Sequence, residues 1–198
     1  MTAAEHLEEP IKGRMVLLPT PPPDGFTARD LPRLMEVVDG RFELLDGEVV
    51  MMAPSNVWHN EVVDWLKFEL RRSAPAAMYV GAEQGINLGG SVPEPDLLVV
   101  SRAAVTDDSL IFQPADVHLA VEVVSPRTKT KDRVLRPAQY AEAGIKRFWR
   151  VEREAARSIV VYTFELRAGG YAPTGEHRRR LEIDRPFRID IELPDPTY

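Results

Sequence analysis

The sequence predicts an α/β fold in which a mixed sheet carries helices on its faces. Segments with helical and β-type apolar spacing follow one another in the order helix, hairpin, helix, strands, helix, strands. The segment 117–124, VHLAVEVV, is apolar without alternation, which is typical of a central strand covered on both faces. Asp46-Gly47 lies between two apolar runs and indicates a tight hairpin turn.

The first predicted helix begins between Thr27 and Pro32 and ends at Gly40. Either Thr27 caps it, with Asp30 three residues later as in a capping box, or Asp30 is itself the cap. Pro32 suits a first turn better than a helix interior. The apolar residues that recur at helical spacing are Leu31, Leu34, Met35 and Val38.

The hairpin is predicted over 41–53, and a second helix follows Ser55 and ends before Pro75. The apolar face of this helix consists of Trp58, Val62, Trp65, Leu66 and Leu70.

The second half of the chain is predicted to be mainly β. Strands broken by glycines are expected over 78–100, and a central strand over 117–124. A helix follows over 128–143, where Pro137 must kink it or open a new helical segment. Further strands are expected at 146–152 and 158–166, with weaker signals over 171–193.

The proline-rich stretch near the N-terminus predicts an extended arm over residues 1–25, followed by a single domain over 26–198. A chain of 198 residues is long enough for one domain with a real core. We expect a cytoplasmic protein, because the first residues do not resemble a signal peptide and no long apolar run could cross a membrane.

Composition excludes several kinds of chemistry. The chain has no cysteine, so disulfides, thiolate metal sites and cysteine nucleophiles are absent. Its formal net charge is −6, whereas proteins that bind phosphates nonspecifically are usually basic. Contact with a nucleic acid would therefore need a local basic patch. The sequence also lacks a nucleophile elbow around Ser125 and a glycine-rich phosphate loop.

Two acidic residues lie where a carboxylate needs a partner. Asp96 follows Pro95 at the start of an apolar strand, and Glu122 lies within the apolar run 119–124. A buried, unpaired carboxylate is costly, so it should pair or bind a cation. The alternatives are a turn-forming role for Asp96 and a core ion pair for Glu122.

If the two strands are neighbours, both carboxylates converge at one edge of the sheet. Carboxylate oxygens suit Mg²⁺ or Mn²⁺, and the carbonyl of Val123 would add a further oxygen. A basic run follows directly, and it is either a solvated helix face or a phosphate-binding surface. The run consists of Arg127, Lys129, Lys131, Arg133 and Arg136.

The ordered motifs resemble those of the Uma-type restriction endonuclease family, a branch of the PD-(D/E)xK nuclease superfamily. FELLDGE at 42–48, PEPD at 93–96 and VEVVSP at 121–126 carry the resemblance, together with the spacing of residues up to Glu152. The resemblance implies a restriction-endonuclease-like fold, a divalent metal such as Mg²⁺ or Mn²⁺, and hydrolysis of DNA phosphodiesters. It also suggests a homodimer, since cutting both strands takes two sites.

Carried over residue by residue, the resemblance makes Asp96 and Glu122 the two metal-binding acids and Glu43 an additional acid. Arg136 stands where this family has a lysine. An arginine can clamp phosphate and stabilise charge, but it cannot serve as a general base. Lys129 or Lys131 could substitute, although neither matches the family position.

Three further residues are weaker candidates. Gln84 matches a polar position of the family and is a candidate for substrate contact or a loop role. His59 is a candidate catalytic or structural histidine. Tyr140, one turn after Arg136, is expected to pack in the core with a partner for its hydroxyl.

The leading hypothesis is therefore a metal-dependent DNA endonuclease, in which Arg136 and the neighbouring lysines bind phosphate. The alternative is a binding or assembly protein that keeps the fold without the chemistry, because Arg136 replaces the family lysine. RNA in place of DNA is a third hypothesis.

Overall fold

The computed structural model describes residues 18–125, 128–154 and 158–194. Residues 1–17 of the predicted arm lie outside the described residues. In the described part of the arm, the backbone N–H of Gly25 donates to the Pro22 carbonyl, and the N–H of Phe26, directly after the arm, donates to the Gly47 carbonyl. Within the described part of the chain, no helix has both the length and the apolar content to span a membrane.

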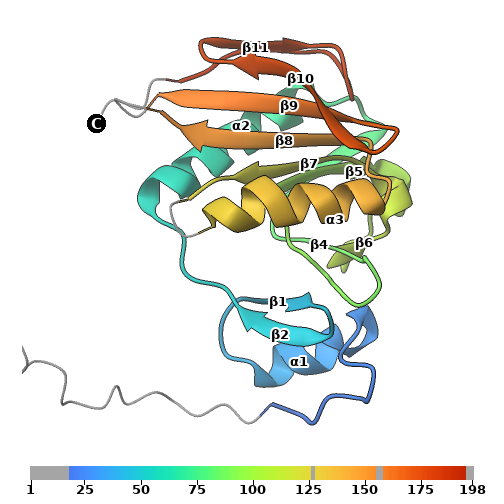
Figure 1. The fold of residues 1–198 in the computed structure, drawn as a ribbon. Coiled ribbons are helices and arrows are strands. Elements are labelled where there is room, and N and C mark those ends of the chain that lie inside the picture. Colours follow the sequence, from blue (N-terminus) through green and yellow to red (C-terminus); the bar gives the residue numbers. More distant parts are fainter. Residues whose placement is uncertain (1–17, 126–127, 155–157, 195–198) are drawn as a thin grey trace, which may run out of the picture.

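A small lobe precedes the main sheet (Figure 1). It contains the short helices η1 (Ala28–Asp30) and α1 (Leu31–Val37) and the hairpin of β1 (Phe42–Leu45) and β2 (Glu48–Met51). The capping box predicted for Thr27 and Asp30 is present. Asp46 and Gly47 both have positive φ, as a two-residue hairpin turn requires. The lobe has its own apolar cluster: Phe26, Leu31, Leu34, Val38, Phe42, Leu44 and Val92.

The main body is a mixed sheet of six strands in the order β10-β9-β8-β7-β5-β3, which confirms the predicted fold class. These strands span Gly170–His177, Ile159–Arg167, Arg147–Arg153, Val117–Val123, Leu97–Ser101 and Met78–Gly81, respectively. Only the β7–β8 pair in this sheet is parallel. The strand predicted to be central, β7, lies between β5 and β8, and every residue in it except His118 is buried.

Short elements complete the chain. β4 (Gly85–Ile86) pairs with β6 (Ile111–Phe112), and β11 (Arg180–Ile183) pairs with β12 (Ile189–Glu192). The single-turn helices η2 (Arg102–Ala104) and η3 (Pro114–Asp116) link the strands between β5 and β7.

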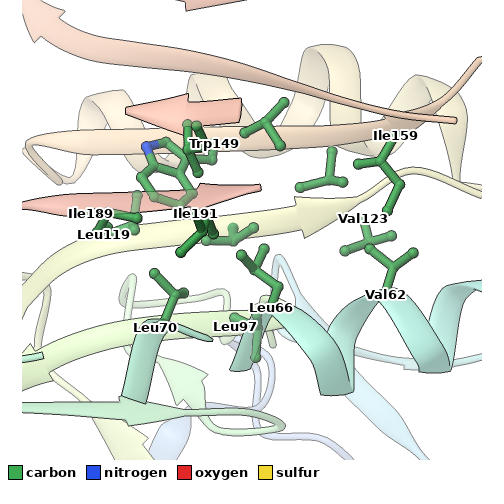
Figure 2. Packing of buried hydrophobic residues seen from close by; sticks show 14 of the residues in the cluster. Val62, Leu66, Leu70, Leu97, Leu119, Val123, Trp149, Ile159, Ile189 and Ile191 are labelled. Carbon is green, nitrogen blue, oxygen red and sulfur yellow. The ribbon is translucent and has the colours of Figure 1, made fainter. Parts of the chain in front are cut away.

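The helices cover opposite faces of the sheet (Figure 1). The helix α2 (Val57–Ser73) packs its apolar side on one face, where the β11–β12 hairpin also lies. Figure 2 shows Val62, Leu66 and Leu70 of this helix against Leu97, Leu119 and Trp149 of the sheet. Tyr140 of α3 (Arg136–Glu142) packs on the other face against Phe148.

The segment before α3 departs from an ordinary α-helix. Residues Lys131–Leu135 form a π-helical turn, η4, in which the Arg136 N–H donates to the Lys131 carbonyl. Pro137 then occupies the first turn of α3, where its missing N–H is tolerated. The expected discontinuity at Pro137 is therefore a widened turn followed by a new helix.

Candidate active site

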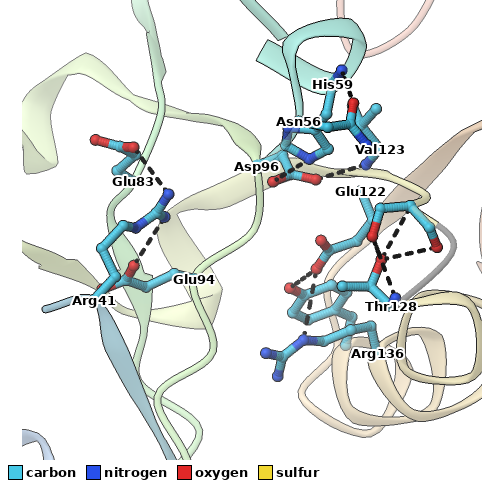
Figure 3. A network of polar contacts seen from close by, with 12 residues as sticks. Arg41, Asn56, His59, Glu83, Glu94, Asp96, Glu122, Val123, Thr128 and Arg136 are labelled. Atoms are coloured by element: carbon cyan, nitrogen blue, oxygen red, sulfur yellow. Dashed lines mark hydrogen bonds and ion pairs between the residues drawn. The ribbon is translucent and has the colours of Figure 1, made fainter. Parts of the chain in front are cut away.

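The register between β5 and β7 brings the two predicted acids together. Leu97 lies opposite Val121 and Leu98 opposite Ala120 in this antiparallel pair. Continuing the register by one residue sets Asp96 opposite Glu122, on the same face of the sheet. Figure 3 shows both carboxylates near the end of β7, and both line one cleft.

Asp96 is held by two donors from different elements. Its Oδ2 accepts the backbone N–H of Val123 at 2.7 Å. Its Oδ1 lies 3.1 Å from Nε2 of His59, which comes from the first turn of α2. That turn is fixed by Asn56, whose side-chain oxygen accepts the His59 backbone N–H. Burial lowers the pKa of His59. The hydrogen bond to Asp96 and the negative charge of Asp96 outweigh burial, so the pKa of His59 is raised overall.

Glu122 is almost fully buried and has a polar partner on α3. The Tyr140 hydroxyl donates to its Oε1 at 2.6 Å, and Nε of Arg136 lies 3.6 Å from the same oxygen. Burial raises the pKa of Glu122 well above its usual range, and the negative charges of Asp96 and Asp132 raise it further. An ionised Glu122 is therefore disfavoured at this position unless it meets a cation or takes up a proton.

Glu43 of β1 is also buried, and both of its carboxylate oxygens meet cations. Lys131 donates to Oε1 at 2.9 Å, and Arg136 donates to Oε2. The guanidinium of Arg136 also donates to the side chain of Gln139, at 3.0 Å. These contacts tie the small lobe to the helical segment that follows β7.

The cleft between the small lobe and the sheet has a volume of about 630 Å³. The hairpin side contributes Arg41, Glu43, Val50, Met51, Met52, Ala53 and Pro54, and the start of α2 contributes Ser55, Asn56 and His59. The rest of its lining comes from the strand ends and the segment after β7, namely Glu94, Asp96, Glu122, Val123, Ser125, Thr128, Lys131 and Asp132.

Asp132 is a further buried carboxylate at this cleft. Burial raises its pKa from 3.8 to about 6, and the charge of Asp96 adds to the effect, while a hydrogen bond with Thr128 opposes it. Glu122, Asp96 and Asp132 thus concentrate negative charge in one place. At neutral pH this repulsion costs stability that a bound cation would recover.

We expect Asp132→Asn to stabilise the metal-free protein at neutral pH. The folded state holds the Asp132 proton more tightly than the unfolded chain does, so wild-type stability falls as pH rises from about 4 to about 6. The variant has no carboxylate at this position and does not lose this stability. The free energy of unfolding of the variant should therefore equal that of the wild type at pH 4 and exceed it by at most about 3 kcal/mol at pH 7.5. Urea unfolding in EDTA at both pH values measures it. An equal difference at the two pH values would contradict the prediction.

The structure brings Asp96 and Glu122 to one cleft, which the predicted metal site requires, and Val123, Glu43 and Lys131 line the same cleft. It differs at Arg136, whose side chain is 0% exposed and does not line the cleft. This arrangement disfavours the expected contact of Arg136 with substrate phosphate, which stays a prediction. Its guanidinium neutralises Glu43 and approaches Glu122, because a buried arginine must pair with acids.

Three other expectations also change. Glu43 has both oxygens paired with cations, which disfavours its predicted role as an additional metal ligand. Lys129 is exposed on the helical segment and does not line the cleft. Gln84 also lies outside the cleft, because its side chain folds back over Gly81. Arg127 falls outside the described residues.

The site contains two residues, His59 and Asp132, whose positions in it the sequence patterns do not indicate. His59, which the sequence offers as a candidate catalytic or structural histidine, contacts Asp96 from the first turn of α2. Asp132 interrupts the basic run that follows Glu122 and is not among the predicted site residues. The sequence places Asp132 only ten residues after Glu122. Helical periodicity, however, does not indicate which residues of a π-helical turn face inward.

The family model described as "Uma2: Putative restriction endonuclease" matches residues 16–194. The chain belongs to the Uma2 family. This membership agrees with the resemblance seen in the motifs around Asp96 and Glu122.

A solved structure supports the fold of this Uma2 protein. It is a crystal structure from Anabaena variabilis described as "a putative nuclease belonging to DUF820", with a TM-score of 0.60 and 11% sequence identity. The alignment covers 81% of this chain and 89% of that one. No curated protein matches the sequence. The restriction-endonuclease-like fold is thus supported by both family and structure.

Proposed function

We propose that this Uma2 protein hydrolyses DNA phosphodiester bonds with the help of Mg²⁺ or Mn²⁺. Asp96, Glu122 and the backbone carbonyl of Val123 would hold the ion. The observation that carries the proposal is the position of Asp96 directly across from Glu122 at one cleft. The family description and the nuclease-like neighbour support the reaction class.

The donor set fits a hard divalent cation. Glu122 is buried among negative charges, and the charge of Asp96 raises its pKa, so the pair favours a positive ion. Among residues 18–125, 128–154 and 158–194, no three His, Asp or Glu side chains form a ready-made ligand group. Mg²⁺ does not need one, because it commonly uses one or two carboxylates and keeps several waters.

When bound, the cation would polarise the phosphodiester and lower the pKa of an attacking water. The protein's own groups keep the two acids in place. Tyr140 orients Glu122, while His59 and the Val123 N–H orient Asp96. Such contacts reduce the motion of a carboxylate that must meet a metal with fixed geometry.

DNA and a second copy of the chain are the proposed partners. Cutting both strands of a duplex takes two such sites, which favours a homodimer. Light scattering on the purified protein tests the dimer, and competition between DNA and RNA of equal length tests the choice of nucleic acid.

A plasmid-cleavage assay tests the proposed activity. The wild-type protein should nick or linearise DNA with Mg²⁺ or Mn²⁺ and lose this activity in EDTA. The alternative is a binding or assembly protein that keeps the fold without the chemistry. It would be favoured if the wild type with metal, the wild type in EDTA and the Asp96→Asn variant all gave the same background level of plasmid cleavage.

We expect His59→Phe to weaken Mn²⁺ binding about 10- to 100-fold, because an outer-shell partner of a ligating carboxylate is lost. Isothermal titration measures the affinity without relying on cleavage. The matched control is His118→Phe, since His118 instead hydrogen-bonds Ser101 and does not line the cleft. Equal Mn²⁺ affinity in the two variants would argue against a role for His59 in positioning Asp96.

A further inference from the structure

We infer that Lys131 contacts a phosphoryl oxygen of the substrate and that Glu43 holds it in position for this contact. The inference rests on the proposed function and deepens it. The positive charge that faces the substrate then comes from Lys131 in the π-helical turn η4. Arg136, five residues later, has a structural role.

Lys131 is one of the two cations among the described residues that line the cleft, and it pairs there with a buried acid. Its Nζ lies 2.9 Å from Oε1 of Glu43, and the side chain is 26% exposed. It lines the same cleft as Asp96 and Glu122. The side chain is therefore ordered by a buried partner and still open to a ligand.

The other cations near the acids are placed differently. Arg41 is the second cation among the described residues that line the cleft, and its guanidinium contacts Glu83 at 3.1 Å and Glu94 at 3.4 Å. Its side chain is 48% exposed, so it belongs to the outer rim. Arg136 is closed off from the cleft, as described above. Lys131 is thus the cation best placed to meet a phosphate held beside Asp96.

The pairing with Glu43 leaves Lys131 able to bind phosphate. A lysine ammonium has three N–H donors, and the hydrogen bond to Glu43 uses one of them. Glu43 also shares its charge with Arg136, so it does not neutralise Lys131 by itself. Because Glu43 is buried and fixed on β1, it limits the rotamer freedom that a free lysine would lose on binding.

The π-helical turn explains how both cations reach one carboxylate. In an α-helix, residues five apart point about 140° away from each other. In η4 the Arg136 N–H donates to the Lys131 carbonyl, five residues back, and both side chains contact Glu43. Such π-bulges occur frequently at functional sites.

The charges in the cleft require a cation of this kind. Five acids line it, namely Glu43, Glu94, Asp96, Glu122 and Asp132, against Arg41 and Lys131. A phosphodiester entering beside Asp96 would be repelled by this excess of acids. A lysine at that point offsets the repulsion and stabilises charge that develops on the phosphoryl oxygens.

The test compares Lys131→Ala with Lys129→Ala, an identical charge change on an exposed neighbour. Binding of a fluorescent single-stranded oligonucleotide in Ca²⁺ is followed by anisotropy. We expect Lys131→Ala to weaken binding about tenfold and Lys129→Ala to weaken it less than about twofold. Lys131→Arg, which keeps the charge, should restore most of the binding. Circular dichroism and thermal melts confirm that each variant is folded.

Cleavage and Mn²⁺ titration separate this inference from the proposed function. Lys131→Ala should cut DNA about 100-fold more slowly while it binds Mn²⁺ as the wild type does. Equal oligonucleotide binding by the two alanine variants would overturn the inference, whatever the wild type cleaves. A wild type that never cuts, but whose binding depends on Lys131, would overturn the proposed function and keep the phosphate contact.

Discussion

Replacing Asp96 with asparagine is expected to abolish metal-dependent cleavage and to weaken Mn²⁺ binding about 100-fold or more. The change preserves the size of the side chain and one oxygen, which can still accept the Val123 N–H. It removes the negative charge opposite Glu122, and hard divalent cations depend strongly on that charge. Isothermal titration with Mn²⁺ and plasmid cleavage measure the two effects.

Asp64→Asn is the matched control for this prediction. Asp64 is an exposed residue on α2, the helix that carries His59, so the variant makes the same chemical change away from the cleft. It should bind Mn²⁺ and cut DNA as the wild type does. If Asp96→Asn retained wild-type affinity for Mn²⁺, the metal site would have to be placed elsewhere.

Replacing Arg136 with methionine is expected to lower the free energy of unfolding by about 3–5 kcal/mol. The guanidinium is fully buried and pairs with Glu43, with Glu122 close by. Methionine fills much of the same space but leaves Glu43 with Lys131 alone and Glu122 with less compensation. A buried carboxylate that loses its counter-charge either stays ionised at an uncompensated desolvation cost or takes up a proton.

Arg167→Met provides the comparison, because Arg167 also pairs with a glutamate but is 62% exposed. Its loss should cost about 1 kcal/mol or less, since solvent screens exposed ion pairs. Urea unfolding at pH 7.5 gives both values. An Arg136→Met variant as stable as Arg167→Met would contradict the buried pairing and reopen Arg136 as a group that faces substrate.

Local patterns predicted most elements of the fold. The Thr27–Asp30 box, the Asp46-Gly47 turn and the apolar spacing of α2 each depend on residues within a few positions, and each appears as expected. The mainly apolar sequence of β7, which does not alternate, correctly indicated a strand covered on both faces. Its neighbours could not be predicted with the same certainty, because strand pairing joins segments far apart in the chain.

Only part of the candidate site was predicted, because the site too depends on contacts between segments far apart in the chain. Asp96 and Glu122 stood out because a carboxylate in an apolar run must have a partner, and the register of β5 on β7 brings them face to face. The helix that carries His59 was predicted, but its contact with Asp96 depends on how α2 packs across the sheet. No spacing rule links residues 37 positions apart.

The sequence by itself determined the residue types available for chemistry and the segments that hold them: oxygen ligands without cysteine, two acids at strand ends, and a basic helix after Glu122. Only the tertiary structure decided which cation faces the cleft. Glu43 comes from a separate lobe, and its burial beside a π-helical turn draws Arg136 inward and leaves Lys131 partly exposed. The physical reason is that the cost of burying a charge depends on partners brought together by folding.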